Sequence, residues 1–245
     1  SFTNVGARLG AEKDLAAGMV YANVSRGFRP PQVTELYRLR GGQSIADLDS
    51  EDLTAVEAGF KNENVSVAVF AEQTRNFLFR DSEAFNVSDG RTRSMGVEFS
   101  GQREVGRHEF QLAATYAKHE YDFARDADAD GREEITDGNE LDSAPRWIAH
   151  AAWRTAITDS LKHELEVNRV GSHFLNAANT ARYKGHYAVN WRLQWQASSS
   201  TEISLRVMNL LDERYADRAD FAFGSYRYFP AMPRQVYLGA RMILD

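Results

Sequence analysis

The sequence predicts an all-β fold: a transmembrane antiparallel β-barrel, to which this chain contributes about eleven strands. Three observations support this prediction. Long segments alternate between apolar and polar residues with a period of two. The connections between them alternate between short and long, and Trp and Tyr stand at the ends of the apolar rows, where membrane interfaces are expected. About eleven strands make half of the 22-stranded barrel that we expect.

Composition agrees with this fold and excludes other classes. The chain has 245 residues, a formal net charge of −6 and no Cys, so a disulfide framework and a thiolate metal site are both excluded. The acidic balance argues against a nucleic-acid-binding face, which needs a basic stripe. No run approaches the roughly 20 apolar residues of a membrane-spanning helix. A barrel strand exposes lipid-facing residues only at every second position, so a polar mean hydropathy is compatible with it.

The predicted strands follow one another along the whole chain. Val65, Val67 and Val69 form one apolar row, and Trp147 to Trp153 form another. The pattern is weakest at 162–173, where only Leu165 and Val167 mark the apolar side. The predicted strands lie at 4–9, 21–26, 53–61, 65–72, 94–100, 110–117, 146–154, 162–173, 187–195, 203–208 and 235–244.

The connections alternate in length. Short turns are predicted at 12–14, 62–64, 104–107, 158–161 and 198–200, and long polar loops at 27–51, 81–91, 121–145, 174–184 and 210–233. Barrels of the outer membrane have tight periplasmic turns and long extracellular loops. Because a sheet cannot leave bare edges in lipid, we expect further strands upstream of Ser1.

Several motifs occur in an order that resembles one family. They are Tyr21–Pro31 with Glu35-Leu36-Tyr37, Glu57–Lys61, Thr92–Glu98, Ala144-Pro145-Arg146, Asn209–Tyr215 and Pro233-Arg234-Gln235. Together they resemble the C-terminal half of the β-barrel of TonB-dependent receptors. The resemblance implies that residues 1–245 form the C-terminal part of such a barrel, with the plug domain and the N-terminal strands outside the chain. In the last strand, Val236 to Leu244 form one apolar row, and we expect an aromatic residue at the next position on it.

The resemblance also implies a function. It predicts an outer-membrane receptor of a Gram-negative bacterium that takes up a scarce nutrient, most often a ferric siderophore, and is no enzyme. The implied partners are outer-membrane lipid and lipopolysaccharide, TonB acting through the plug, and a small nutrient ligand. Glu57, Glu98, Arg192 and Arg206 are expected to face the lumen, where they would contact the plug or the water path. A passive porin-type channel and a receptor for cobalamin, haem or carbohydrate remain alternatives, although residues 27–51 contain no His for haem.

The candidate ligand-binding residues lie in two predicted loops. The first loop contributes basic residues with one tyrosine, and the last loop mixes aromatic and basic residues. Guanidinium groups bind carboxylates and phosphates bidentately and stack on aromatic ligands, which suits an anionic chelate. The alternative is that the arginines pair with lipopolysaccharide or with loop carboxylates. The candidates are Arg29, Tyr37, Arg38, Arg40, Tyr226, Arg227 and Tyr228, with Arg26 beside the first group.

An acidic loop is a candidate calcium site. Asp126, Asp128, Asp130 and Gly131 match positions 1, 3, 5 and 6 of a calcium loop, and Asp137 falls at position 12. Asp replaces the usual Glu at position 12, and Glu133 stands where a hydrophobic residue is expected. The alternative is a solvated acidic loop without metal. No other cofactor is expected, and no arrangement of nucleophile and base indicates catalysis.

Overall fold

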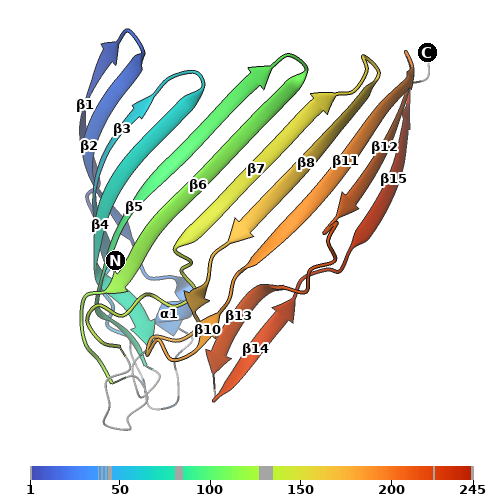
Figure 1. Ribbon diagram of the computed structural model, residues 1–245. Helices are drawn as coiled ribbons and strands as arrows, with labels where there is room; N and C mark the ends of the chain where they lie inside the picture. The colour runs from blue at the N-terminus through green and yellow to red at the C-terminus, as the bar shows by residue number, and fades with distance from the viewer. Residues whose placement is uncertain are drawn as a thin grey trace.

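The computed structural model describes residues 2–37, 39, 41, 43, 46–80, 85–126, 135–222 and 224–243. Its main feature is an 11-stranded antiparallel sheet in which each strand pairs with its neighbour along the chain. The sheet curves as part of a barrel wall, with tight hairpins at one end and long connections at the other (Figure 1). In the described residues β1 and β15 are its two free edges. The strands are β1 (Ala7–Leu15), β2 (Gly18–Arg29), β3 (Glu51–Lys61), β4 (Val65–Arg80), β5 (Asn86–Val105), β6 (His108–Tyr121), β7 (Trp147–Ala156), β8 (Leu161–Val170), β11 (His186–Ser198), β12 (Thr201–Met208) and β15 (Gln235–Met242).

The predicted alternation is confirmed by the strand register. Val24, Val56, Ala71 and Met95 are consecutive cross-strand partners, so one face of the sheet is apolar. We call it the apolar face and the opposite one the polar face. The four residues predicted to face the lumen, Glu57, Glu98, Arg192 and Arg206, all lie on the polar face. In a membrane barrel the apolar face meets lipid and the polar face lines the interior.

Aromatic residues border the apolar face at both ends. Tyr116 and Trp147 are cross-strand partners with ring centroids 4.7 Å apart on the loop side. Phe110 and Trp153 stack at 6.5 Å on the turn side. Amphipathic rings favour the two interfaces of a bilayer, so these pairs mark the edges of the apolar band.

Glycines on the polar face give room to aromatic side chains. A Cβ on Gly59 would lie 2.7 Å from the Tyr21 hydroxyl and 2.6 Å from the Val67 carbonyl oxygen. A Cβ on Gly96 would lie 2.7 Å from the Phe70 ring. Both rings therefore lie across the backbone of the neighbouring strand, which explains glycine in these two strand interiors.

Some predicted boundaries are wrong. Residues 12–14 belong to β1, and the turn lies at Ala16–Ala17, before Gly18 with φ 146°. Glu12 and Asp14 are polar-face residues of a continuing strand, so their charge did not indicate a turn. The predicted loop 81–91 is also too long, because β5 begins at Asn86. Leu244, the last residue of the final apolar row, lies outside the described residues.

Two predicted loops contain short hairpins of their own. The loop after β8 contains β9 (His173–Phe174) and β10 (Arg182–Tyr183), and the loop after β12 contains β13 (Ala216–Ala222) and β14 (Ser225–Pro230). The one helix of the described residues is α1 (Val33–Tyr37) in the first long loop. At five residues it falls far short of the length that crosses a membrane.

Candidate functional site

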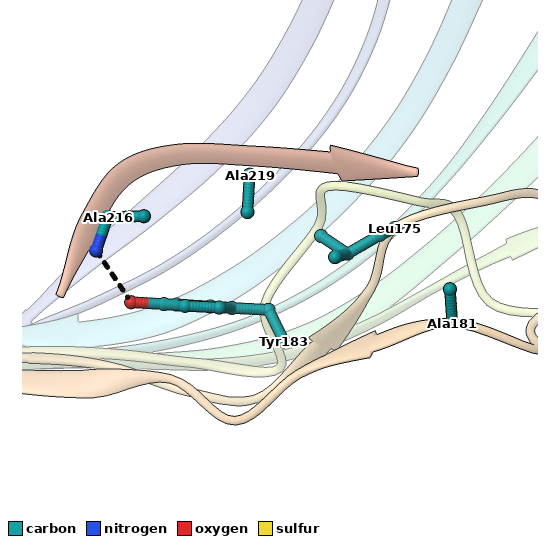
Figure 2. Close-up of a cluster of buried hydrophobic side chains, with 5 residues drawn as sticks. All are labelled: Leu175, Ala181, Tyr183, Ala216 and Ala219. Carbon is teal, nitrogen blue, oxygen red and sulfur yellow. Dashed lines mark hydrogen bonds between the residues drawn. The ribbon is translucent and has the colours of Figure 1, made fainter. Parts of the chain in front are cut away.

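The long connections pack on one another into a layer at one end of the wall. Leu175, Ala181 and Tyr183 from the loop after β8 are buried against Ala216 and Ala219 of β13 (Figure 2). A second buried cluster joins the end of β6 to the following loop through Tyr121, Phe123 and Ile135. Phe77, Phe79, Leu141 and Ala177 pack against this second cluster.

Polar contacts tie the same loops together. Asn139 Nδ2 donates to the carbonyl oxygen of Ala177 at 2.9 Å, and the amide of Glu140 donates to Asn179 Oδ1 at 2.8 Å. The Tyr121 hydroxyl donates to Asp142 Oδ1 at 2.6 Å. The three loops that follow β6, β8 and β12 therefore form one packed body through their described residues.

A cavity of about 620 Å³ lies beneath the last of these loops, at the loop end of the polar face. This volume falls within the range of small-molecule sites, roughly 300–1,000 Å³. The His186 and Tyr215 rings stack with centroids 4.1 Å apart. Burial raises the pKa of the Tyr215 hydroxyl, with the charge of Asp217 acting in the same direction, so this group stays a neutral donor and acceptor. The lining residues include Asn190, Arg206, Tyr237, His186, Tyr215 and Asp217.

Below this cavity a ladder of ion pairs crosses the polar face. Arg154 pairs with Glu109 at 2.8 Å and also with Glu164. Arg192 pairs with Glu164 at 2.6 Å, and Glu166 accepts hydrogen bonds from Asn190 and Asn168 at 2.9 and 2.7 Å. Charges alternate in this way only from β6 to β11, because the cross-strand partner of Arg192 on β12 is a second cation, Arg206.

Of the residues predicted in the first loop, the structure places Arg26 and Arg29 on opposite faces of β2. Arg29 ends β2 on the polar face, where Nε and Nη2 donate to Glu51 at 2.7 and 2.9 Å and Nη1 donates to Glu35 at 3.1 Å. Arg26 lies on the apolar face and pairs with Asp52 at 3.0 Å, because an odd spacing along a strand changes the face. Tyr37 ends α1 and is 77% exposed. Arg38 and Arg40 lie outside the described residues.

The residues predicted in the last loop lie on β14. Tyr226 and Tyr228 are exposed and stack at 6.1 Å, while Arg227 Nε donates to Asp220 at 2.5 Å. The Arg227 guanidinium holds the pKa of Asp220 below its usual range. Among the described contacts, none joins this hairpin to Arg29 or Tyr37. The ligand role of all these residues stays a prediction.

The predicted calcium loop is only partly described. Asp128 and Asp130 lie outside the described residues, whereas Asp126 and Asp137 lie within them. Asp137 is 3.7 Å from Arg93 Nη2, a cation that would compete with a metal ion for this carboxylate. In the described part of the chain no group of three or more metal-ligating side chains gathers. Calcium binding stays a prediction.

Comparison with known proteins decides the family. The family model described as TonB dependent receptor-like, beta-barrel, matches residues 3–210, well over half of the chain. The chain belongs to the TonB-dependent receptor family. This is a family of receptors and transporters rather than enzymes, and its members sit in the Gram-negative outer membrane.

Individual relatives agree with this assignment. The pesticin receptors of Yersinia enterocolitica and Yersinia pestis are 33% identical over 85 residues, which is 34% of this chain and 13% of theirs. The ferric yersiniabactin uptake receptor of Yersinia pestis has a TM-score of 0.77 and 23% identity over 96% of this chain and 36% of that one. The ferric-catecholate import receptor of E. coli K12 has a TM-score of 0.75 and 21% identity over 96% of this chain and 34% of that one. The chain thus spans about a third of the length of these two structures, and the structural likeness shows the fold.

In a TonB-dependent receptor barrel, the cavity lies in the upper interior, below the loops. The sequence interpretation missed most of its residues. Arg206 was expected only to face the lumen, and His186 and Tyr237 were not among the predicted site residues. Arg206 and Tyr237 are cross-strand partners on the polar face. Two signals in the sequence point to these residues. The alternation puts Arg206 and Tyr237 on the polar side of their strands, and Tyr215 ends the Asn209–Tyr215 motif.

Proposed function

We propose that this chain is the C-terminal part of an outer-membrane receptor that takes up a ferric siderophore. The complete receptor also contains a plug domain, through which TonB drives uptake. The observation that carries the proposal is the cavity of about 620 Å³ below the packed loops, lined by Arg206, His186 and Tyr215. A guanidinium with neutral aromatic rings suits an anionic chelate that has its own aromatic groups.

The position of the cavity also favours a receptor over an open pore. The loops above it bury apolar side chains against one another, which holds a shaped site in place. A passive porin-type channel needs no such layer over its interior. The named relatives supply the chemical class, since the two similar structures named above are receptors for the uptake of ferric yersiniabactin and of ferric catecholates.

Uptake of radioactive iron tests this proposal. The complete gene that encodes this chain would be expressed in a bacterial host that lacks its own siderophore receptors, with and without functional TonB. The probes are ferric yersiniabactin, ferric enterobactin, ferric citrate, cobalamin and haem. We expect uptake of one ferric chelate that requires TonB.

An Arg206→Gln variant should raise the concentration for half-maximal uptake about tenfold, which corresponds to loss of one charge-assisted contact. Arg241→Gln, near the turn end of β15 on the same polar face, is the matched control. Uptake that does not need TonB would instead establish a passive channel, and uptake of cobalamin or haem alone would replace the ligand class.

A further inference from the structure

A groove with a volume of about 520 Å³ lies on the apolar face, towards the turn end of β4 to β8. It runs along β5 from Phe99 to Arg103, which is about 13 Å of strand. Phe110 and Trp153 border the groove, and most of its lining residues are apolar. Its volume is within the range of small-molecule sites, roughly 300–1,000 Å³.

Small residues hollow out the groove. Gly101 is opposite Leu112, which is opposite Ala151. In the next row towards the turns, Phe110 is opposite Trp153. Glycine has no side chain and alanine has only a methyl group, so the first row lies lower than the aromatic row beside it. The groove therefore follows from residue size on paired strands, which hold its shape.

The turn end of the groove carries two charges without an ionic partner. Arg103 lines the groove, and Glu63 lies in the adjoining turn, where its carbonyl oxygen accepts a hydrogen bond from Gln102 Nε2 at 3.1 Å. Both charged residues are exposed. The connections on this side, at 62–64, 106–107 and 157–160, all lie within the described residues. In that part of the chain no ion pair within 4.0 Å includes Arg103 or Glu63.

His108 supplies a hydrogen-bond donor beside Arg103. Trp153 Nε1 donates to His108 Nδ1 at 3.3 Å, so the neutral imidazole carries its proton on Nε2. His108 is exposed and lies two residues before Phe110, the cross-strand partner of Arg103. Arg103 and His108 are therefore diagonal neighbours on one face, about 7–8 Å apart, and both can reach one phosphate group.

We propose that this groove binds one molecule of phosphatidylethanolamine from the periplasmic leaflet. Its phosphate lies at Arg103 and His108, and one acyl chain lies in the groove beside Phe110 and Trp153. The proposal rests on the outer-membrane placement proposed above, because the turn end of the wall then faces the periplasm.

The two unpaired charges select the headgroup. A guanidinium group binds phosphate through charge-assisted hydrogen bonds, which Arg103 provides. The ammonium group of the same lipid pairs with the Glu63 carboxylate. An anionic phospholipid such as phosphatidylglycerol has no ammonium group, so it would leave Glu63 without a partner beside its own negative charge.

Lipid binding to the complete receptor tests the proposal. Native mass spectrometry would measure binding of phosphatidylethanolamine, phosphatidylglycerol and diacylglycerol, which has no headgroup phosphate. Arg103→Gln and Glu63→Gln remove the two charges. Arg107→Gln is the matched control, because it removes a cation at the same end of the wall that is already paired with Asp159 at 3.0 Å.

A second pair of variants tests the groove itself. Ala151→Leu fills the groove with an apolar side chain, so the face stays apolar. Ala149→Leu makes the same change on the same strand and face, outside the groove. Heat-dependent migration in gel electrophoresis confirms that each variant is folded before its lipid binding is compared. If Ala151→Leu does not fold, the smaller change Ala151→Val replaces it.

We expect Arg103→Gln and Ala151→Leu each to weaken binding of phosphatidylethanolamine about tenfold, and both controls to bind like wild type. Glu63→Gln should weaken binding of phosphatidylethanolamine but not of phosphatidylglycerol.

Three results would overturn the proposal. An equal loss in Arg107→Gln, no loss in Arg103→Gln, or equal binding of diacylglycerol would remove the phosphate site. Unchanged binding in Ala151→Leu would show that the chain lies elsewhere. Equal binding of phosphatidylglycerol by the wild type, or an equal effect of Glu63→Gln on both phospholipids, would overturn the choice of headgroup. Iron uptake is measured separately, so failure of transport and failure of lipid binding are distinguishable.

Discussion

The hydroxyl of Tyr183 accepts a hydrogen bond from the backbone amide of Ala216 at 3.2 Å, which joins the loop after β8 to the loop after β12 (Figure 2). The same hydroxyl lies 2.9 Å from His186 Nδ1, to which it can donate. Tyr183→Phe removes both bonds and leaves a buried amide unsatisfied, at a local cost of about 1–3 kcal/mol. We expect faster proteolysis of the hairpin 216–230. Tyr226→Phe, on an exposed ring of that hairpin, should behave like wild type, and equal protection of Tyr183→Phe would contradict the role of this bond.

A second prediction concerns the first long loop. Arg29 binds Glu35 and Glu51 through three nitrogens, a geometry that one ammonium group cannot reproduce. Arg29→Lys should therefore loosen residues 30–37 and 46–50 by about 1 kcal/mol, a modest value because the side chain is 39% exposed. Hydrogen exchange of these amides measures the change. Arg26→Lys on the apolar face is the control, and unchanged exchange in Arg29→Lys would show that the two carboxylates do not hold the loop.

A third prediction is a dependence of loop stability on pH. Burial lowers the pKa of His173 despite its hydrogen bond to the carbonyl oxygen of Gly171 and the charge of Asp142. The folded loop then binds a proton less well than the unfolded loop. Its stability is complete above the unfolded pKa of about 6.5 and decreases as the pH falls through 6.5 towards the lowered folded value.

Hydrogen exchange of residues 171–185 at several pH values tests this sign. Protection should decrease from about pH 7.5 to 5, and His173→Gln should remove that part of the slope. Protection that instead rises at acid pH would mean that the protonated imidazole is the favoured form in the folded loop.

The fourth prediction compares two glycines of the polar face. Gly59→Val would place side-chain atoms against Tyr21 and the Val67 carbonyl, whereas a Cβ on Gly27 meets nothing within 4 Å. Overpacking costs about 1–3 kcal/mol, so Gly59→Val should lower the yield of folded barrel and Gly27→Val should not. Heat-dependent migration in gel electrophoresis reports the folded fraction. Equal yields would show that the Tyr21 ring moves aside without cost.

The wall of the barrel could be predicted from the sequence because each side chain reports its face through a period of two. This period alone places Trp147, Trp153 and Val67 on the apolar side, without information about residues distant in sequence. The same period of two separates Arg26 from Arg29, because residues three positions apart lie on opposite faces of a strand. The prediction that put both in one loop site did not apply this rule. Turn prediction failed at Glu12 because charge at the end of a barrel strand does not distinguish strand from turn.

The packed loops could not be predicted in this way. Leu175 and Ala219 are buried only because two segments distant in sequence meet in space, and neither segment has a regular period. The cavity below them also depends on contact between distant segments, since Tyr215, in the connection after β12, stacks on His186 at the start of β11. The candidates on β14 were identified as an aromatic–basic group, but their sequence gave no information on which loop they would approach.

The pairing of every strand with its neighbour has a consequence for how such receptors diversify. The register of the wall is set by the tight hairpins and by local partners, so the long connections add little to the cost of forming it. Doubling the length of a flexible loop costs only about 0.6 kcal/mol in closure entropy. A connection such as residues 122–146 can therefore be extended, shortened or exchanged during evolution while the strands beneath keep their pairing. One inherited wall can in this way acquire a new cargo without a new fold.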